Sequence, residues 1–170
     1  MVNMILETNK IRLELTRSDN ISKLIQIENE NSEFIGQYDF SRHLEVIENK
    51  DEMHLSIFDK SDNLLIGHII LAGIENENKS IEFRRIVISK KGCGFGREAV
   101  FLIKKFCFGY LGAHRIWLDV LSENERAIGL YKSQGFITER VQRDCIKLNG
   151  ELRSLNFMSI LKNSNDWKIS

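Results

Sequence analysis

A chain of 170 residues has the size of one domain and is long enough to bury a core without covalent staples. Its composition is ordinary for a globular protein, with 42% hydrophobic and 28% charged residues. The 24 Lys and Arg residues balance the 24 Asp and Glu residues, so the basic excess typical of nucleic-acid-binding proteins is absent and no nucleic-acid partner is expected.

The N-terminal half contains strand and helix patterns in turn. Residues Ile11–Leu15 alternate apolar and polar side chains, which predicts a half-buried strand. Residues Ser18–Asn20 offer caps for a helix that begins near Ile21, and a second helix is expected over Phe40–Asn49. Three further strands are predicted at Leu55–Phe58, Leu64–Ala72 and Ile81–Ser89, the first two joined by a turn.

The C-terminal half opens on a glycine-rich turn, Lys91–Gly96, followed by a helical pattern over Arg97–Leu111 that Gly112 ends. A clear strand, Arg115–Leu121, precedes a short helix at Asn124–Gln134, whose start Ser122 and Glu125 would fix as a capping box. Two last strands flank Asn149–Gly150, a strong hairpin turn. This order predicts an α/β (α+β) domain with a mixed sheet and helices on its faces.

The glycine-rich turn has the composition of a phosphate site. Glycines between a strand and a helix let a ligand approach the backbone, and the free N–H groups and dipole of the helix start favour an anion. Gly92, Gly94 and Gly96 alternate, which fits neither a P-loop nor the dinucleotide fingerprint. A tight turn that binds nothing is an equal alternative for the loop alone.

A second segment, Asn124 to Phe136, carries two polar side chains at a helical spacing. Asn124 and Tyr131 are seven residues apart, so both point to nearly the same side of a helix. Alone, these residues are better explained as a helix cap and a buried aromatic residue.

Together the two segments resemble the superfamily of GCN5-related N-acetyltransferases (GNAT). The family's acetyl-CoA loop, Arg/Gln-x-x-Gly-x-Gly/Ala, is similar to Lys91–Gly96, with Lys91 as a departure. Its later signature matches Asn124, Ala127, Tyr131, Gly135 and Phe136 at every spacing. The ends of the chain are similar to the ribosomal-protein-alanine N-acetyltransferases and the spermidine acetyltransferases. The resemblance implies a mixed, mostly antiparallel sheet of about seven strands with about four helices, in one domain over residues 1–162 with a tail at 163–170.

The resemblance also implies acetyl-CoA as the cosubstrate. The pyrophosphate would lie over the loop and the helix start, and the preceding strand would hold the pantetheine arm through its backbone. The residues expected to bind the cofactor are Ile86, Val87, Ile88, Gly92, Cys93, Gly94, Phe95, Gly96, Arg97, Asn124 and Tyr131.

The proton transfers that the reaction needs define the catalytic roles. An amine of pKa near ~10 must lose a proton before it attacks the thioester, and the departing thiolate gains from an acid. Tyr131 matches the family's general acid. Glu82 is the candidate base, although a surface carboxylate paired with Arg84 is an equal alternative. His68 and His114 are further options, and Asp119 is expected to be a strand residue with a polar partner.

The acceptor is less defined by the sequence. Glu28, Glu30, Glu33 and Asp39 could attract a cationic amine, but a solvated helix face explains them better. The segment Phe34–Tyr38 departs from the acidic-aromatic stretch of the spermidine enzymes. The expected function is therefore the transfer of an acetyl group, by direct attack, to a primary amine that belongs to a small molecule or to a peptide N-terminus. A polyamine acetyltransferase and a non-catalytic acyl-CoA-binding module are the alternatives.

The remaining expectations concern location and partners. Cys93, Cys107 and Cys145 have no spacing typical of disulfides or zinc, which favours a reducing cytoplasm and no metal. No signal peptide or membrane-spanning run is visible, so no membrane partner is expected. The exposed strands of the last hairpin are compatible with a homodimer.

Overall fold

The computed structural model describes residues 4–164, so the predicted tail lies largely outside the described residues. One sheet runs through the molecule in the strand order β1-β2-β3-β4-β5-β6-β8-β7, in which only the β5–β6 pair is parallel. The strands are β1 Ile5–Glu7, β2 Ile11–Leu15, β3 Glu52–Asp59, β4 Leu65–Ala72, β5 Ser80–Ile88, β6 Arg115–Leu121, β7 Ile137–Leu148 and β8 Glu151–Leu161. The predicted mixed sheet is confirmed, with eight strands in place of about seven because the three-residue β1 is too short to show a pattern.

The helices are α1 Ile21–Asn29, α2 Phe40–Glu48, α3 Phe95–Lys105 and α4 Glu125–Ser133. A 3₁₀ turn, Ser18–Asn20, precedes α1, and a π-helical turn, Phe106–Tyr110, follows α3. The helix α3 begins two residues earlier than the sequence predicted. α4 is capped by Asn124, whose side chain accepts a hydrogen bond from the Ala127 N–H at 3.2 Å. The predicted capping box is wrong, because Ser122 donates to Asn156 instead.

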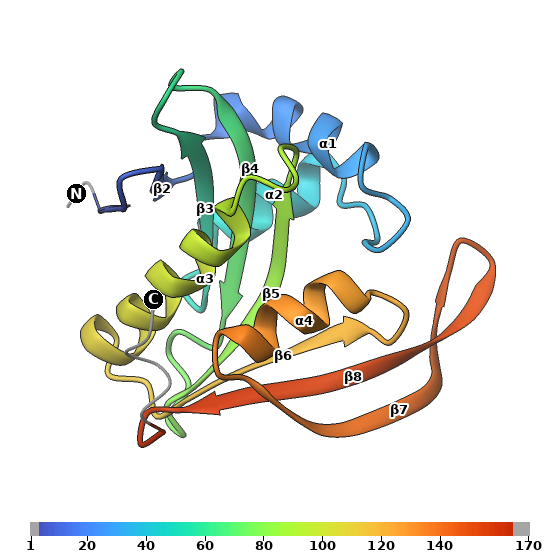
Figure 1. Cartoon of the computed structure of the whole chain (residues 1–170). Coiled ribbons are helices and arrows are strands. Elements are labelled where there is room, and N and C mark those ends of the chain that lie inside the picture. The colour runs from blue at the N-terminus through green and yellow to red at the C-terminus, as the bar shows by residue number, and fades with distance from the viewer. Residues whose placement is uncertain (1–3, 165–170) are drawn as a thin grey trace.

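The helices cover the two faces of the sheet in pairs. α3 and α4 lie on one face, and α1 and α2 lie on the other (Figure 1). The larger apolar core fills the α3–α4 side, and a smaller cluster of Leu24, Ile27 and Val87 joins α1 to β5. β4 lies near the middle of the sheet and is buried along nearly its whole length. In residues 4–164 no helix is both long enough and apolar enough to cross a bilayer.

A β-bulge in β5 changes which side chains face α1 and α2. Ile70 pairs with Arg85 and Leu71 with Phe83, so Arg84 is the extra residue. Before the bulge Phe83 faces the larger core, and after it Ile86 and Ile88 do so. Because the alternation shifts by one residue, Arg84 and Arg85 can both lie on the α1–α2 side. Simple strand periodicity cannot predict this arrangement.

Candidate active site

The sheet opens between its two parallel strands. The ladder between β5 and β6 joins Ser80–Glu82 to Arg115–Trp117 and ends there, although β5 continues to Ile88 and β6 to Leu121. β4 pairs with the other edge of β5 as far as Ile88. The β5 backbone groups that face the opening are therefore placed to bind a ligand between the strands. The predicted cofactor residues Ile86, Val87 and Ile88 all lie on this segment.

The glycine-rich loop lies at the far end of β5, where it leads into α3. Gly92 and Gly94 have φ values of 76° and 80°, in the left-handed region that favours glycine. Gly94 is the N-cap of α3 and has no side chain to occupy the free N–H groups of the first turn. The loop can therefore present backbone donors and a helix dipole to an anion.

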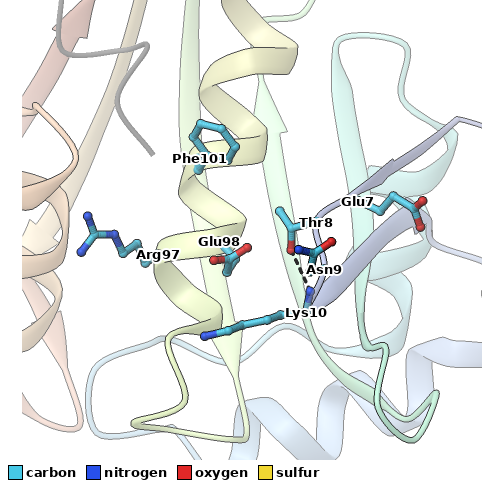
Figure 2. Close-up of a pocket in the computed structure, with 7 residues that line it drawn as sticks. All are labelled: Glu7, Thr8, Asn9, Lys10, Arg97, Glu98 and Phe101. Carbon is cyan, nitrogen blue, oxygen red and sulfur yellow. Dashed lines mark hydrogen bonds between the residues drawn. The ribbon is translucent and has the colours of Figure 1, made fainter.

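Positive side chains gather around this loop. Lys10, in the turn between β1 and β2, reaches along the start of α3 (Figure 2), and its Nζ lies 3.5 Å from where a Cβ on Gly94 would stand. Lys10 and Arg97 also line an open cavity of about 510 Å³ with Glu7, Thr8, Asn9, Glu98 and Phe101. Partial burial, together with the charge of Arg126, lowers the pKa of Lys91. Lys10 is far from the loop in the chain, so no local sequence pattern links the two.

Tyr131 lies on the α3–α4 side of the opening. Its side chain is buried, with its ring centroid 6.2 Å from that of Phe83 on β5 and 5.7 Å from that of Phe136. Burial and the negative charge of Asp119 raise the pKa of the Tyr131 phenol above its ordinary value. The hydroxyl is therefore protonated at neutral pH, as a general acid must be.

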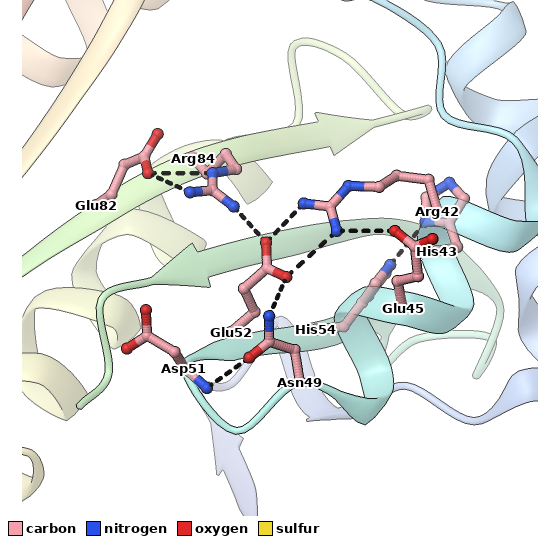
Figure 3. A network of polar contacts seen from close by, with 9 residues as sticks. All are labelled: Arg42, His43, Glu45, Asn49, Asp51, Glu52, His54, Glu82 and Arg84. Atoms are coloured by element: carbon pink, nitrogen blue, oxygen red, sulfur yellow. Dashed lines mark hydrogen bonds and ion pairs between the residues drawn. The ribbon is translucent and has the colours of Figure 1, made fainter. Parts of the chain in front are cut away.

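Glu82 lies on β5 at the last residue paired with β6. Arg84 donates two hydrogen bonds to its Oε2, at 2.7 Å from Nη2 and 3.1 Å from Nε. Arg84 also contacts Glu52, which Arg42 binds at 2.7 Å, so the four side chains form one ion-pair network (Figure 3). The pairing with Arg84 that the sequence left open is present, and the role of Glu82 as a base stays a prediction.

Asp119 lies on β6, two residues beyond the last pair with β5. Asp119 is exposed, and partial desolvation by the surrounding protein, together with the charge of Glu82, raises the pKa of its carboxyl. Asp119 pairs across the ladder with Phe157, whose ring stacks on Trp117 at 6.4 Å. Asp119 therefore interacts electrostatically with both Glu82 and Tyr131. The sequence treated it as an ordinary strand residue, because only the order of strands brings β5 and β6 together.

The two histidines considered as bases lie elsewhere. His68 is in the middle of β4 and is fully buried, which lowers its pKa. His114 is exposed just before β6, and its backbone N–H donates to the Lys79 carbonyl just before β5. It therefore lies at the opposite end of β5 from the glycine-rich loop.

Comparison with known proteins decides the family. The model of the family described as "Acetyltransferase (GNAT) family" matches residues 21–136, which is more than half of the chain. The chain belongs to the GNAT family. It is an N-acetyltransferase, and the acetyltransferases of this family use acetyl-CoA.

Relatives and solved structures support the same assignment. The acetyltransferase is 30% identical over 123 residues to a protein named probable N-acetyltransferase from Bacillus subtilis (strain 168), covering 71% of this chain and 68% of that protein. It is 31% identical over 117 residues to the spermidine N(1)-acetyltransferase of Vibrio cholerae, covering 68% and 67%. A crystal structure of the Vibrio cholerae spermidine N-acetyltransferase with CoA and spermine has a TM-score of 0.81 at 25% identity, covering 91% of this chain and 96% of that one.

The acidic residues near α1 do not form one solvated face in the acetyltransferase. Glu28 is fully buried, and Asp39 caps α2 by accepting a hydrogen bond from the Arg42 N–H at 2.8 Å. Glu30 and Glu33 are exposed. The tip of the β7–β8 hairpin reaches this region, where the Asn149 side chain donates to the Ser32 carbonyl at 3.1 Å. The segment between α1 and α2 and the β7–β8 hairpin therefore meet at this contact.

Proposed function

We propose that the protein transfers the acetyl group of acetyl-CoA directly to a primary amine within a ternary complex. The observation that carries this proposal is the opening between β5 and β6. It has the cationic glycine-rich loop beyond the end of β5, Tyr131 on one side and Glu82 with Asp119 at its closed end. A thioester bound in the opening would lie between an acid and a carboxylate pair.

The proton accounting follows from this placement. The neutral amine attacks the thioester carbonyl carbon, a C–N bond forms, and the C–S bond breaks. Tyr131 gives its phenolic proton to the departing sulfur, and a carboxylate, directly or through water, takes the proton that the amine loses. Cys93 is exposed in the phosphate loop, and no acylated enzyme is needed. Asn124 holds the start of the helix that carries Tyr131, in addition to its proposed contact with CoA.

Polyamines are the second candidate acceptors. The relatives named above include a spermidine acetyltransferase, and the open face of the sheet beside Asp119 carries the stacked rings of Trp117 and Phe157. Carboxylates beside aromatic rings suit an alkylammonium chain, because the rings contact its methylenes and attract its charge. The Phe34–Tyr38 segment still departs from the acidic stretch of the spermidine enzymes.

Calorimetric titration with acetyl-CoA, followed by a thiol-release screen, tests the function. The screen should include diamines, spermidine, spermine and peptides with free N-termini. Turnover of one class identifies the acceptor. Binding without turnover of any amine supports the acyl-CoA-binding alternative, and failure to bind acetyl-CoA contradicts the proposal.

Lys10→Gln is expected to raise the KM for acetyl-CoA about three- to tenfold with little change in kcat. Its ammonium would lose a charge-assisted contact with a phosphate, which in an exposed position contributes about 1 kcal/mol. Steady-state kinetics at varied acetyl-CoA measure the effect. Lys60→Gln is the matched control, because Lys60 is paired with Glu7 and the Thr8 carbonyl on the same side of the molecule. Equal effects of the two variants would exclude a specific role for Lys10.

Glu82→Gln is expected to shift the acidic limb of the kcat/KM profile to lower pH. A base works when deprotonated, so activity falls as the pH drops through its pKa. The charge of Glu82 raises the pKa of Asp119, and its removal should lower that pKa. Loss of the limb together with a large loss of kcat would identify Glu82 itself as the base. An unchanged profile would remove Glu82 from the mechanism, and Asp119→Asn then tests the second carboxylate.

We further propose that the protein acts in the cytoplasm and forms homodimers. Its three cysteines are free, which suits a reducing compartment. Ile137, Val141 and Leu152 expose apolar side chains on the long β7–β8 hairpin, where a second copy could cover them. A Vibrio cholerae spermidine N-acetyltransferase with a TM-score of 0.77 is described as dodecameric, which supports self-association.

A further inference from the structure

Three of the four histidines in the sequence meet in one buried cluster on the α1–α2 side of the sheet. His43 comes from α2, His54 from β3 and His68 from β4, and Glu28 of α1 lies among them. All four residues are between 0 and 2% exposed. Buried charges and imidazoles are costly unless they are paired or coordinate an ion, so this cluster requires an explanation beyond packing.

We propose that Glu28, His43 and His68 bind a divalent transition-metal ion, of which Zn²⁺ is the best match. One ligand atom from each of the three lies within 4.8 Å of the others. His68 Nε2 is 2.9 Å from Glu28 Oε1, and His43 Nε2 is 3.3 Å from Glu28 Oε2. Tetrahedral ligands around Zn²⁺ at about 2.0–2.2 Å stand roughly 3.3–3.6 Å apart, so small side-chain shifts would admit the ion.

An unsatisfied atom supports this reading. His43 Nε2 is buried and lies 3.3 Å from Glu28 Oε2, but it makes no well-aligned hydrogen bond among the described residues. Its other ring nitrogen, Nδ1, contacts His54 Nε2 at 2.9 Å, and His54 Nδ1 contacts Thr16 Oγ1 at 2.9 Å (Figure 3 shows the histidine pair). If His43 donates to His54 and His54 donates to Thr16, His43 Nε2 carries a lone pair that faces the Glu28 carboxylate. A cation between the lone pair and the carboxylate would relieve their repulsion.

The same contacts give His43 the outer support that metal-binding histidines normally have, whereas His68 Nδ1 is buried without a hydrogen-bond partner among the described residues. A metal-binding histidine usually donates its second N–H to another polar group, as His43 can to His54. Thr16 Oγ1 in turn lies 2.8 Å from Ser56 Oγ, which ends the chain of contacts. The Tyr38 N–H donates to Glu28 Oε2 at 3.1 Å and fixes the carboxylate.

The positive charge of Arg85 opposes the binding of a metal ion beside Glu28. Its Nη1 lies 3.0 Å from Glu28 Oε1. The guanidinium also contacts the Gly36 carbonyl and lies 3.8 Å from the centroid of the Tyr38 ring. These partners hold Arg85 beside Oε1, whereas the unsatisfied His43 atom faces Oε2. The two imidazoles and one carboxylate suit Zn²⁺ better than Mg²⁺ or Ca²⁺, which prefer oxygen ligands.

The proposed ion would be structural. It would tie α1 and α2 to β4. The ligands come from three elements far apart in the chain, so no sequence spacing predicts the site. This proposal does not depend on the identity of the acceptor or on catalysis.

Zinc titration of the chelator-treated, dialysed protein tests the proposal. We expect one Zn²⁺ per chain by elemental analysis and a rise in Tm of about 5–10 °C at a hundredfold excess over Kd. His43→Gln and His68→Gln should each abolish both effects. His114→Gln, which changes the fourth histidine outside the cluster, should retain them.

Co²⁺ in the unmodified chain gives a second readout that does not require the variants to fold. Intense visible bands of a four-coordinate ion, removed by adding Zn²⁺, would support the site. The weak bands of a six-coordinate ion, a chain that retains no zinc after dialysis, or binding unchanged in both folded variants would overturn the proposal and leave a hydrogen-bonded cluster.

Discussion

Replacing Tyr131 with Phe is expected to lower kcat about 10²–10⁴-fold while leaving the affinity for acetyl-CoA nearly unchanged. The phenylalanine keeps the ring that packs on Phe83 and Phe136 but removes the proton for the departing CoA thiolate. The raised pKa of the Tyr131 phenol keeps that proton in place at neutral pH. Thiol-release kinetics with a saturating amine, combined with calorimetric titration of acetyl-CoA, measure the two quantities separately.

Tyr110→Phe is the matched control, because Tyr110 is 77% exposed in the turn after α3. It should leave kcat unchanged. A loss of less than about tenfold in Tyr131→Phe would mean that solvent can protonate the thiolate, and Tyr131 would then be a packing residue.

Gly67→Ala is expected to lower the free energy of unfolding by about 3 kcal/mol. A Cβ at Gly67 would stand 2.0 Å from the Val87 carbonyl oxygen and 3.0 Å from the Ile88 Cα, both of which are backbone atoms. β4 and β5 would have to separate along the segment that we assign to the pantetheine arm. Urea unfolding followed by circular dichroism measures the change, and the KM for acetyl-CoA should rise as well.

Gly129→Ala provides the comparison within the same protein. Gly129 lies inside α4, and a Cβ there would meet nothing within 4 Å. Alanine favours a helix interior over glycine, so this variant should gain about 0.5–1 kcal/mol. If Gly67→Ala costs less than about 1 kcal/mol, β4 and β5 can move apart freely, and the steric argument fails.

Local patterns predicted most of the fold because they depend on neighbouring residues in the chain. The Asn149–Gly150 turn is an example: both residues have positive φ, at 50° and 82°, as a tight hairpin turn needs. Local sequence signals likewise predicted the positions of α1, α2 and α4. The sequence offered two caps for one helix start, Ser122 and Asn124, and the structure shows that Asn124 caps α4.

The candidate site was predictable in its chain-local parts. The glycine-rich loop and the spacing of Asn124 and Tyr131 could be recognised because each lies within one turn or one helix. Lys10 could not, since the fold brings it to Gly94 from the other end of the chain. Asp119 gained its relation to Glu82 and Tyr131 only when β6 was placed beside β5.

The sequence by itself therefore determined the family and the element types, and it predicts the residues of the cofactor loop, because these features repeat at short and fixed spacings. Only the tertiary structure decided the shape of the opening and the burial of Glu28. The β-bulge at Arg84 and the end of the β5–β6 ladder at Glu82 depend on pairing between distant segments. The cluster of Glu28, His43 and His68 depends on packing α1 and α2 against β4, which no local spacing encodes.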